Sequence, residues 1–272
     1  MTSHRQLFFL DMGYWKLDVG YWTFSPYTYP DMTKPPPPRM LRIFWLAALL
    51  LWWVVWLMPV SDRVTRAGGL ALFCVVWFGL IGLCWRRRAV RFLLGGITLL
   101  AAGFLSLPAR SHPDVEALRG GFIAGMQRYH GSPYSWGGES PMGIDCSGLI
   151  RRGLMDALFC QGIRTGDPGL VRRAMRLWWH DTSARALGEQ YDGLTIHLFD
   201  APGINALDHS RLMPGDLAVT RSGVHIMAYL GNNLWIEADP GAGHVIRVTA
   251  PSPDNGWFDT PVSLMRWRLL DK

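Results

Sequence analysis

The sequence predicts an α+β protein in which three apolar helices precede a folded domain. Three uncharged stretches lie between residues 43 and 109. After a turn rich in glycine and serine, apolar residues recur from residue 149 at the spacing of a half-buried helix. From residue 216 onward, short segments rich in β-forming residues alternate with turns, which is typical of an antiparallel sheet.

Residues 1–39 form an N-terminal tail rich in aromatic residues. The tail ends in a proline run, Pro35 to Pro38, which predicts an extended polyproline segment. Its length and flanks do not match a cleaved signal peptide. Because Met40 directly precedes the first apolar stretch, translation starting at Met40 is an alternative that would leave the tail outside the protein.

Residues 40–110 are predicted to be a transmembrane region, followed by a short linker, Pro108 to Pro113. The spans are expected at about 43–60, 67–85 and 92–109, each of 18 or 19 residues. That length is at the lower end of what a helix needs to cross about 30 Å of hydrocarbon. Glycines dilute the third stretch, so an interfacial or buried helix is its alternative.

The positive charge lies in this membrane region. Residues 1–110 hold 12 Lys+Arg against 4 Asp+Glu, whereas residues 111–272 hold 15 against 17. Arginines that flank membrane spans explain this distribution, and a nucleic-acid partner is not expected because its basic surface would lie on the folded domain. The four cysteines show neither a disulfide framework nor a metal-binding spacing, and Cys160 is expected to be a buried core residue.

The arginines also predict an orientation. Arg86, Arg87, Arg88 and Arg91 lie between the second and third spans, and the positive-inside rule places this loop in the cytoplasm. Three spans then put the folded domain on the outer face of the membrane. Two spans would put it in the cytoplasm, and we favour three.

The stretch Gly131 to Arg152 carries the candidate nucleophile, Cys146, at the predicted start of a helix with Asp145 as N-cap. Unpaired N–H groups and the helix dipole at such a position lower the pKa of a thiol and favour the thiolate. The alternative is a buried small hydrophobic residue. Among the eight histidines, only His225 begins a buried-looking strand directly after a Ser-Gly turn, which makes it the candidate base.

The other elements of residues 111–272 follow from local patterns. A helix is expected over Val115 to His130, and Asp167 with Pro168 predicts the start of another. A short helix is expected over Ser183 to Gln190. Predicted strands are Leu217 to Thr220, His225 to Leu230, Leu234 to Ala238, Val245 to Thr249 and Val262 to Leu270.

Four ordered blocks carry a family resemblance: PYSWGG at 133–138, DCSGLI at 145–150, LMPGDLAV at 212–219 and VHIMAYLGNN at 224–233. Together, over about residues 116–272, they resemble the NlpC family of papain-like cysteine peptidases, which cut peptidoglycan stem peptides. The resemblance implies a papain-like core without metal or other cofactor in residues 111–272. It also implies an insertion at about 160–210, because related chains connect Cys to His more briefly. A lid or substrate wall is one role for this insertion, and a packing elaboration is the alternative.

The resemblance assigns Cys146 as nucleophile and His225 as base. The residue that orients the imidazole lies on the next strand and is commonly His, or sometimes Asn or Gln, in the family. Here Glu237 occupies the matching position, which is a departure, although a carboxylate also stabilises an imidazolium. Asp239 lies two residues further on and is the fallback.

The resemblance also implies the substrate contacts. The Cys146 backbone N–H and the Tyr134 hydroxyl are expected to stabilise the oxyanion. Asp145 and Ser147 are expected to bind the amine or carboxylate of the stem peptide, with a purely capping role as the alternative for Asp145. Trp136 is expected to shape the cleft wall, with a core position as its alternative.

The preferred hypothesis is a membrane-anchored cysteine peptidase on the periplasmic face of the inner membrane, with the peptidoglycan stem peptide and the lipid bilayer as partners. One alternative is a thiol acyltransferase or amidase that acts on a lipid or protein substrate. The other is a non-catalytic membrane-anchored binding module.

Overall fold

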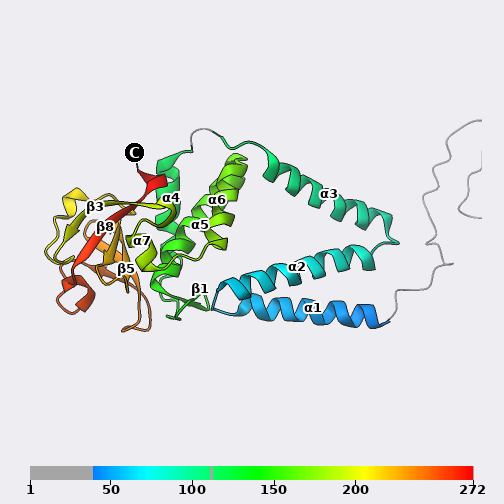
Figure 1. Cartoon of the computed structure of the whole chain (residues 1–272), viewed down its shortest axis with the longest axis horizontal. Helices are drawn as coiled ribbons and strands as arrows, with labels where there is room; N and C mark the ends of the chain where they lie inside the picture. Colours follow the sequence, from blue (N-terminus) through cyan, green and yellow to red (C-terminus); the bar gives the residue numbers. More distant parts are fainter. Residues whose placement is uncertain (1–38, 111–112, 272) are drawn as a thin grey trace, which may run out of the picture.

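Three long apolar helices form the first part of the computed structural model, which describes residues 39–110 and 113–271 (Figure 1). They are α1 (Arg39–Leu57), α2 (Arg63–Leu83) and α3 (Arg88–Ser106). All three are long and apolar enough to cross a membrane, as the sequence predicted. The predicted polyproline segment, Pro35 to Pro38, lies outside the described residues, as does part of the predicted linker, residues 111–112.

The first helix ends earlier than the predicted span. It stops at Leu57, and Val60 belongs to a turn, because Pro59 lacks an N–H and disfavours a helical conformation at Met58. The Asp62 side chain then caps α2 by accepting a hydrogen bond of 2.8 Å from the Thr65 N–H. Residues 58–62 are therefore the turn of a helical hairpin.

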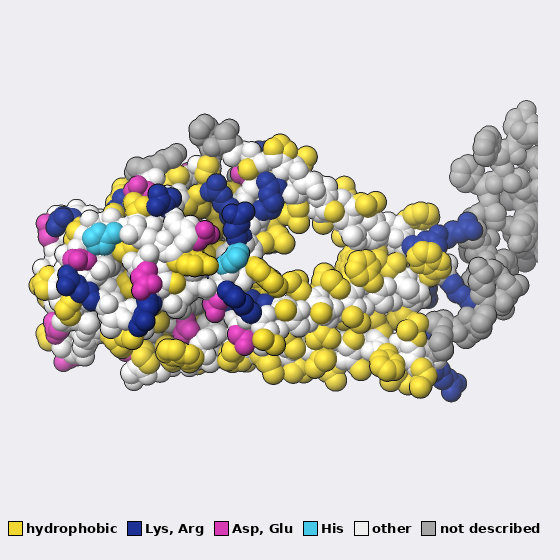
Figure 2. All heavy atoms as spheres, in the orientation of Figure 1, with side chains coloured by type: hydrophobic (Ala, Val, Ile, Leu, Met, Phe, Trp, Pro, Cys, Tyr) yellow, Lys and Arg dark blue, Asp and Glu magenta, His cyan; other side chains and the backbone are white. Residues whose placement is uncertain are grey.

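The hairpin helices α1 and α2 lie side by side, whereas α3 diverges from them (Figure 1). The Trp45 indole donates a hydrogen bond of 2.8 Å to the Val76 carbonyl, which joins α1 to α2. Figure 2 shows a hydrophobic surface along the hairpin and Lys and Arg side chains at its far end. The hairpin turn thus faces the folded domain, while the arginine-rich turn between α2 and α3 lies at the opposite end.

The folded domain packs helices against an antiparallel sheet, which confirms the α+β prediction. Its helices are α4 (Val115–Gln127), α5 (Cys146–Thr165), α6 (Pro168–Trp179) and α7 (Ala184–Gly188). The six-stranded sheet has the order β3-β8-β4-β5-β6-β7, with β3 (Thr195–Ala201), β4 (Leu217–Thr220), β5 (Ile226–Gly231), β6 (Leu234–Asp239), β7 (His244–Thr249) and β8 (Val262–Trp267). All five strand pairings are antiparallel.

Two hydrophobic clusters cover the two faces of the sheet. Apolar side chains of α4 and α5, among them Phe122 and Leu149, pack with Ile226 and Trp267 on one face. On the other face, Trp235 and Phe258 pack with residues of the loops. Because side chains alternate along a strand, the sheet buries residues on both sides, and α5 is held firmly against it.

The segment at 160–210 adds α6, α7 and an edge strand. The Asp167 carboxylate caps α6 by accepting from the Gly169 N–H at 2.8 Å, with Pro168 in the first position, as the sequence predicted. Strand β3 was not predicted; it completes the sheet beside β8. The prediction of a buried Cys160 was wrong: the residue is exposed, because it lies beside the exposed Phe159 in a part of α5 outside the buried positions of the helix.

Candidate active site

The candidate nucleophile begins helix α5, directly after the two short strands β1 (Glu139–Ser140) and β2 (Gly143–Ile144). The Asp145 side chain caps the helix: Oδ1 accepts from the Gly148 N–H at 2.6 Å and from the Ser147 hydroxyl at 3.0 Å. Its Oδ2 accepts from the Gly137 N–H at 2.8 Å. Both oxygens of Asp145 therefore fix the backbone around Cys146.

Position 148 has to be glycine for this arrangement. A Cβ atom there would lie 2.2 Å from the Gly138 carbonyl oxygen, a backbone atom that cannot move aside cheaply. The same Gly138 oxygen accepts a hydrogen bond of 3.1 Å from the Asp145 N–H. The loop at 137–138 thus approaches the start of α5 closely enough to hold Cys146 in place.

The Cys146 thiol is a buried, protonated group in this conformation. Burial first, and the negative charge of Asp145 second, raise the pKa of the Cys146 thiol to about 12. The expectation of a pKa lowered by the helix N-terminus was wrong, because desolvation outweighs the helix end and its backbone N–H groups. A base must therefore remove the proton before the sulfur can act as a nucleophile.

His225 and Glu237 form a buried pair on neighbouring parts of the sheet. Strand β5 begins at Ile226, one residue later than predicted, so His225 lies directly before it, and Glu237 lies within β6. The imidazole Nε2 is 2.5 Å from Glu237 Oε2, and the two residues are 1% and 0% exposed. Because Glu237 engages Nε2, Nδ1 is the ring nitrogen left to exchange a proton with a thiol.

Two further residues fix this pair. Asn255 Nδ2 donates a hydrogen bond of 2.6 Å to Glu237 Oε1, so both carboxylate oxygens have partners. The Trp257 indole stacks on the imidazole, with ring centroids 4.2 Å apart and an interplanar angle of 20°. Neither residue was identified from the sequence, where Asn255 and Gly256 indicate no more than a turn.

Asp239, the fallback for the orienting residue, has a different role. Its Oδ1 accepts from the Trp257 indole N–H at 3.1 Å and from the Gly241 N–H at 2.9 Å. Its Oδ2 accepts from the Ala242 N–H at 3.2 Å. Asp239 thus holds the turn after β6 and the stacked indole, and Glu237 is the carboxylate on the imidazole.

The thiol lies beside the backbone that carries the imidazole. Cys146 Sγ is 3.9 Å from the carbonyl oxygen of Val224, the residue before His225. Within residues 39–110 and 113–271, Sγ and the imidazole ring share no hydrogen bond. Catalytic hydrogen bonds of this kind are often loose without substrate and tighten when it binds.

A cleft of about 480 Å³ opens at the thiol. Its lining includes five predicted site residues: Tyr134, Trp136, Asp145, Cys146 and Ser147. Trp136 is 79% exposed, so it belongs to the cleft wall and not to the core. Burial raises the pKa of Tyr134 to about 12, with Cys146 as the next cause, so the hydroxyl keeps its proton and can donate it to an oxyanion.

The described part of the chain holds no group of three His, Cys, Asp or Glu side chains that could bind a metal ion. The cleft offers a thiol at a helix start, and the buried His225–Glu237 pair lies behind its lining residue Val224, outside the lining itself. This combination defines a class of protein: hydrolases and acyl-transfer enzymes that use a cysteine nucleophile.

The family follows from the comparison with known proteins. Residues 131–261 match the NlpC/P60 family, so the chain carries an NlpC/P60 domain, which is a cysteine peptidase domain. Dipeptidyl-peptidase 6 of Lysinibacillus sphaericus is 40% identical over 158 residues, which are 58% of this chain and 46% of that protein. The chain therefore spans less than half the length of this relative.

Two solved structures are also similar. The P60 domain of an antigen from M. avium subspecies paratuberculosis is 24% identical, with a TM-score of 0.36, over 58% of this chain and 98% of that one. The peptidoglycan hydrolase RipB from Mycobacterium tuberculosis is 20% identical, with a TM-score of 0.37, over 64% of this chain and 79% of that one. The assignment of the NlpC/P60 domain rests on the sequence match over residues 131–261.

Proposed function

We propose that the chain is a membrane-anchored cysteine peptidase that hydrolyses an amide bond in peptidoglycan stem peptides, with residues 40–110 as the anchor and 111–272 as the peptidase domain. The observation that carries the proposal is the position of Cys146, at the start of α5, in a cleft beside the backbone of His225. The buried His225–Glu237 pair supplies the base that a thiol with a raised pKa needs.

The geometry supports a thiol acyl-enzyme mechanism. His225 Nδ1 takes the Cys146 proton as the sulfur attacks the amide carbon, while Glu237 holds Nε2–H and stabilises the imidazolium. The backbone N–H of Cys146, in the first turn of α5, and the Tyr134 hydroxyl stabilise the oxyanion. The imidazolium then gives its proton to the leaving amine, and a water molecule hydrolyses the thioester by the same route.

Three lines of support point to a stem peptide as substrate. The family that the sequence blocks resemble cuts peptidoglycan stem peptides, and the 40% identical relative is named a dipeptidyl-peptidase. The cleft volume of about 480 Å³ is suited to a few residues of peptide. We place the cleaved bond next to D-glutamate, and Asp145 and Ser147 near the termini of the bound peptide.

The arrangement of the helices supports a domain on the outer face of the inner membrane. An odd number of spans puts the two ends of the chain on opposite sides. The turn of the α1–α2 hairpin contacts the peptidase domain, so both lie on one side, and the arginine-rich α2–α3 turn lies at the other end. By the positive-inside rule, that arginine-rich turn is cytoplasmic.

The test is to incubate the full chain in detergent with purified peptidoglycan fragments and to analyse the products by mass spectrometry. Cys146→Ala is the control. New stem-peptide products seen with the wild type and missing with Cys146→Ala support the proposal, and their masses identify the bond. A wild type without products contradicts it, and turnover of a lipid or protein substrate would then establish acyl transfer at the membrane instead.

A further inference from the structure

The turn of the membrane hairpin pairs with the loop that leads to the nucleophile. The Ser61 N–H donates to the Gly137 carbonyl at 2.9 Å, and the Glu139 N–H donates to the Pro59 carbonyl at 3.1 Å. Val60 and Gly138 form an antiparallel bridge between these two hydrogen bonds. The hairpin turn therefore pairs, like a short β-strand, with the loop at residues 137–139 that leads to Cys146.

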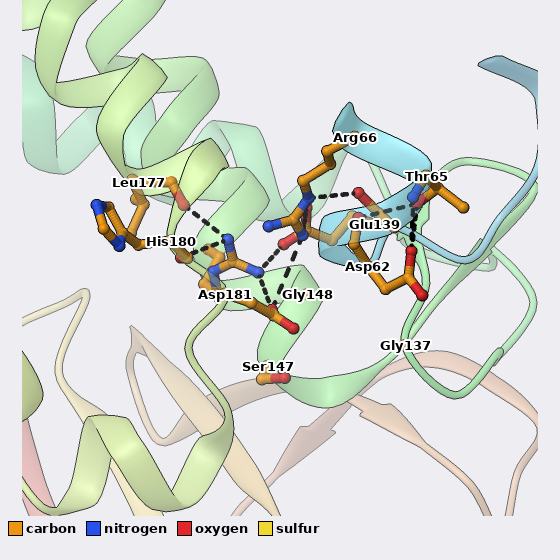
Figure 3. A network of polar contacts seen from close by, with 12 residues as sticks. Asp62, Thr65, Arg66, Gly137, Glu139, Ser147, Gly148, Leu177, His180 and Asp181 are labelled. Carbon is orange, nitrogen blue, oxygen red and sulfur yellow. Dashed lines mark hydrogen bonds and ion pairs between the residues drawn. The ribbon is translucent and has the colours of Figure 1, made fainter. Parts of the chain in front are cut away.

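A buried network of charges fixes this contact (Figure 3). Arg66, from the first turn of α2, is 3% exposed, and its Nη2 lies 3.0 Å from Glu139 Oε2. Glu139 also pairs with Arg151 of α5, and Arg151 Nη1 lies 2.9 Å from Asp181 Oδ1. Since loss of one partner of a buried ion pair is strongly destabilising, Arg66 holds α2 rigidly against the domain.

The same turn lines the catalytic cleft. Val60, Ser61 and Asp62 lie in the cleft lining together with Cys146. The peptide unit around Gly137 links the two sides, because its carbonyl accepts from Ser61 while its N–H donates to Asp145, the cap of the nucleophile helix. Substrate bound at Cys146 therefore meets the membrane hairpin as part of the binding site.

Among the carboxylates of the cleft lining, Asp62 is the one that combines a free oxygen with no arginine ion pair among the residues that the structure describes, whereas Asp181, whose Oδ2 is also free, pairs through Oδ1 with Arg151. Glu139 and Asp181 are paired with arginines, and both oxygens of Asp145 accept hydrogen bonds. Asp62 Oδ1 accepts from Thr65, whereas its Oδ2 accepts no hydrogen bond from any residue that the structure describes. The Thr65 backbone N–H lowers the pKa of the exposed Asp62 carboxyl, so it is ionised at neutral pH.

We propose that the hairpin turn, residues 58–62, is part of the substrate-binding site and that Asp62 binds a positively charged amine of the substrate. That this substrate is a peptide rests on the proposed function. A charged acceptor oxygen on the wall of a cleft favours a cationic donor over a neutral one. The anchor thus takes part in recognition as well as in holding the enzyme at the membrane.

A matched pair of variants separates this role from helix capping. Asp62→Asn removes the charge and keeps an N-cap oxygen, since asparagine caps helices about as well as aspartate. Asp114→Asn is the control: Asp114 is an exposed N-cap of α4, accepts from the Ala117 N–H at 3.0 Å, and lies outside the cleft lining. Both variants are expected to fold like the wild type.

The first measurement is steady-state kinetics of the full chain in detergent. Two peptides are compared, one with a free amine and one acetylated at every amine. With Asp62→Asn, KM for the free-amine peptide should rise about fivefold, which is the effect of one solvent-exposed charge pair, while kcat stays within about twofold. The acetylated peptide and Asp114→Asn should show no change. Equal KM values for wild type and Asp62→Asn, or an equal rise for both peptides, would overturn the proposal.

The second measurement does not depend on turnover. Cationic and neutral methanethiosulfonates are reacted with Cys146 at low salt, and the modified peptide is followed by mass spectrometry with the exposed Cys160 as internal reference. Asp62→Asn should lower the cationic-to-neutral rate ratio at Cys146 about threefold and leave the ratio at Cys160 unchanged. An unchanged ratio at Cys146 would refute the placement of Asp62 in the site. If the ratio falls but no stem peptide is cleaved, the proposed function is wrong, whereas the placement of Asp62 and the hairpin turn in the site is supported.

Discussion

Replacing Glu237 by glutamine should inactivate the enzyme through the tautomer of His225. Glu237 Oε2 lies 2.5 Å from His225 Nε2, and Oε1 accepts from Asn255 Nδ2 at 2.6 Å. The Asn255 side-chain amide cannot flip, because its Oδ1 accepts a hydrogen bond of 3.0 Å from the backbone N–H of Trp257. The glutamine must therefore accept from Asn255 with its oxygen and donate to His225 with its nitrogen. That donation puts the ring proton on Nδ1, the nitrogen that has to accept the Cys146 proton.

The expected loss in kcat for Glu237→Gln is about 10⁴-fold, the loss found when a wrong imidazole tautomer is imposed in the serine-protease template. A second substitution should restore part of it. In Glu237→Gln with Asn255→Asp, the new carboxylate accepts from both the glutamine and the Trp257 N–H, so the glutamine oxygen can again face His225. We expect the double variant to recover about tenfold or more in kcat.

The assay is the rate of stem-peptide cleavage by the full chain in detergent, with thermal unfolding measured in parallel. Asp239→Asn is the matched control on the same strand, and its kcat should stay within about threefold because Asp239 does not contact the imidazole. A Glu237→Gln or Glu237→Ala variant with kcat within about threefold of the wild type would refute Glu237 as the orienting residue. A double variant no faster than the single one would refute the tautomer argument.

Three other outcomes are expected. Since burial and Asp145 raise the pKa of Cys146 to about 12, the rate of its alkylation by iodoacetamide should be low at pH 7 and rise about tenfold per pH unit up to pH 10. In Asp145→Asn the alkylation rate should be higher at every pH. A rate that reaches a plateau below pH 7 would contradict this. Trp257→Ala should lower kcat about tenfold because it exposes the His225 ring to solvent, whereas Trp257→Phe should keep most of the wild-type kcat. Equal kcat values for Trp257→Ala and Trp257→Phe would refute the stacking role. A reporter fused after Pro113 should be active outside the cytoplasm, and one in the α2–α3 turn inside; the reverse pattern would refute the three-span orientation.

Much of the fold could be predicted because its signals are local. Three uncharged stretches predicted the three long apolar helices, and the short segments rich in β-forming residues between turns predicted β4 to β8 within a residue or two, apart from the C-terminal end of β8. The N-caps Asp145 and Asp167 were correct because a cap bonds N–H groups only two or three residues away. Strand β3 was missed, since it owes its place to pairing with β8, some 65 residues later.

The candidate site divides in the same way. Cys146, His225 and Glu237 were selected from motif blocks and strand positions, and the structure brings the last two together. Asn255 and Trp257 were missed because each acts through a contact with a residue distant in the sequence. The direction of the Cys146 pKa was also wrong, because desolvation depends on how many atoms from other segments surround the sulfur.

The sequence by itself determined the class of this protein: apolar helices followed by an NlpC/P60 domain with a cysteine at a helix start. These properties depend on composition, periodicity and short-range capping. Only the tertiary structure decided that Arg66 of the apolar helix α2 pairs with Glu139, close to the start of α5, and that Asp62 reaches the cleft. Two residues more than 70 positions apart carry no local sign of such a pairing. The pair forms because folding buries both charges, and each buried charge then needs the other as its partner.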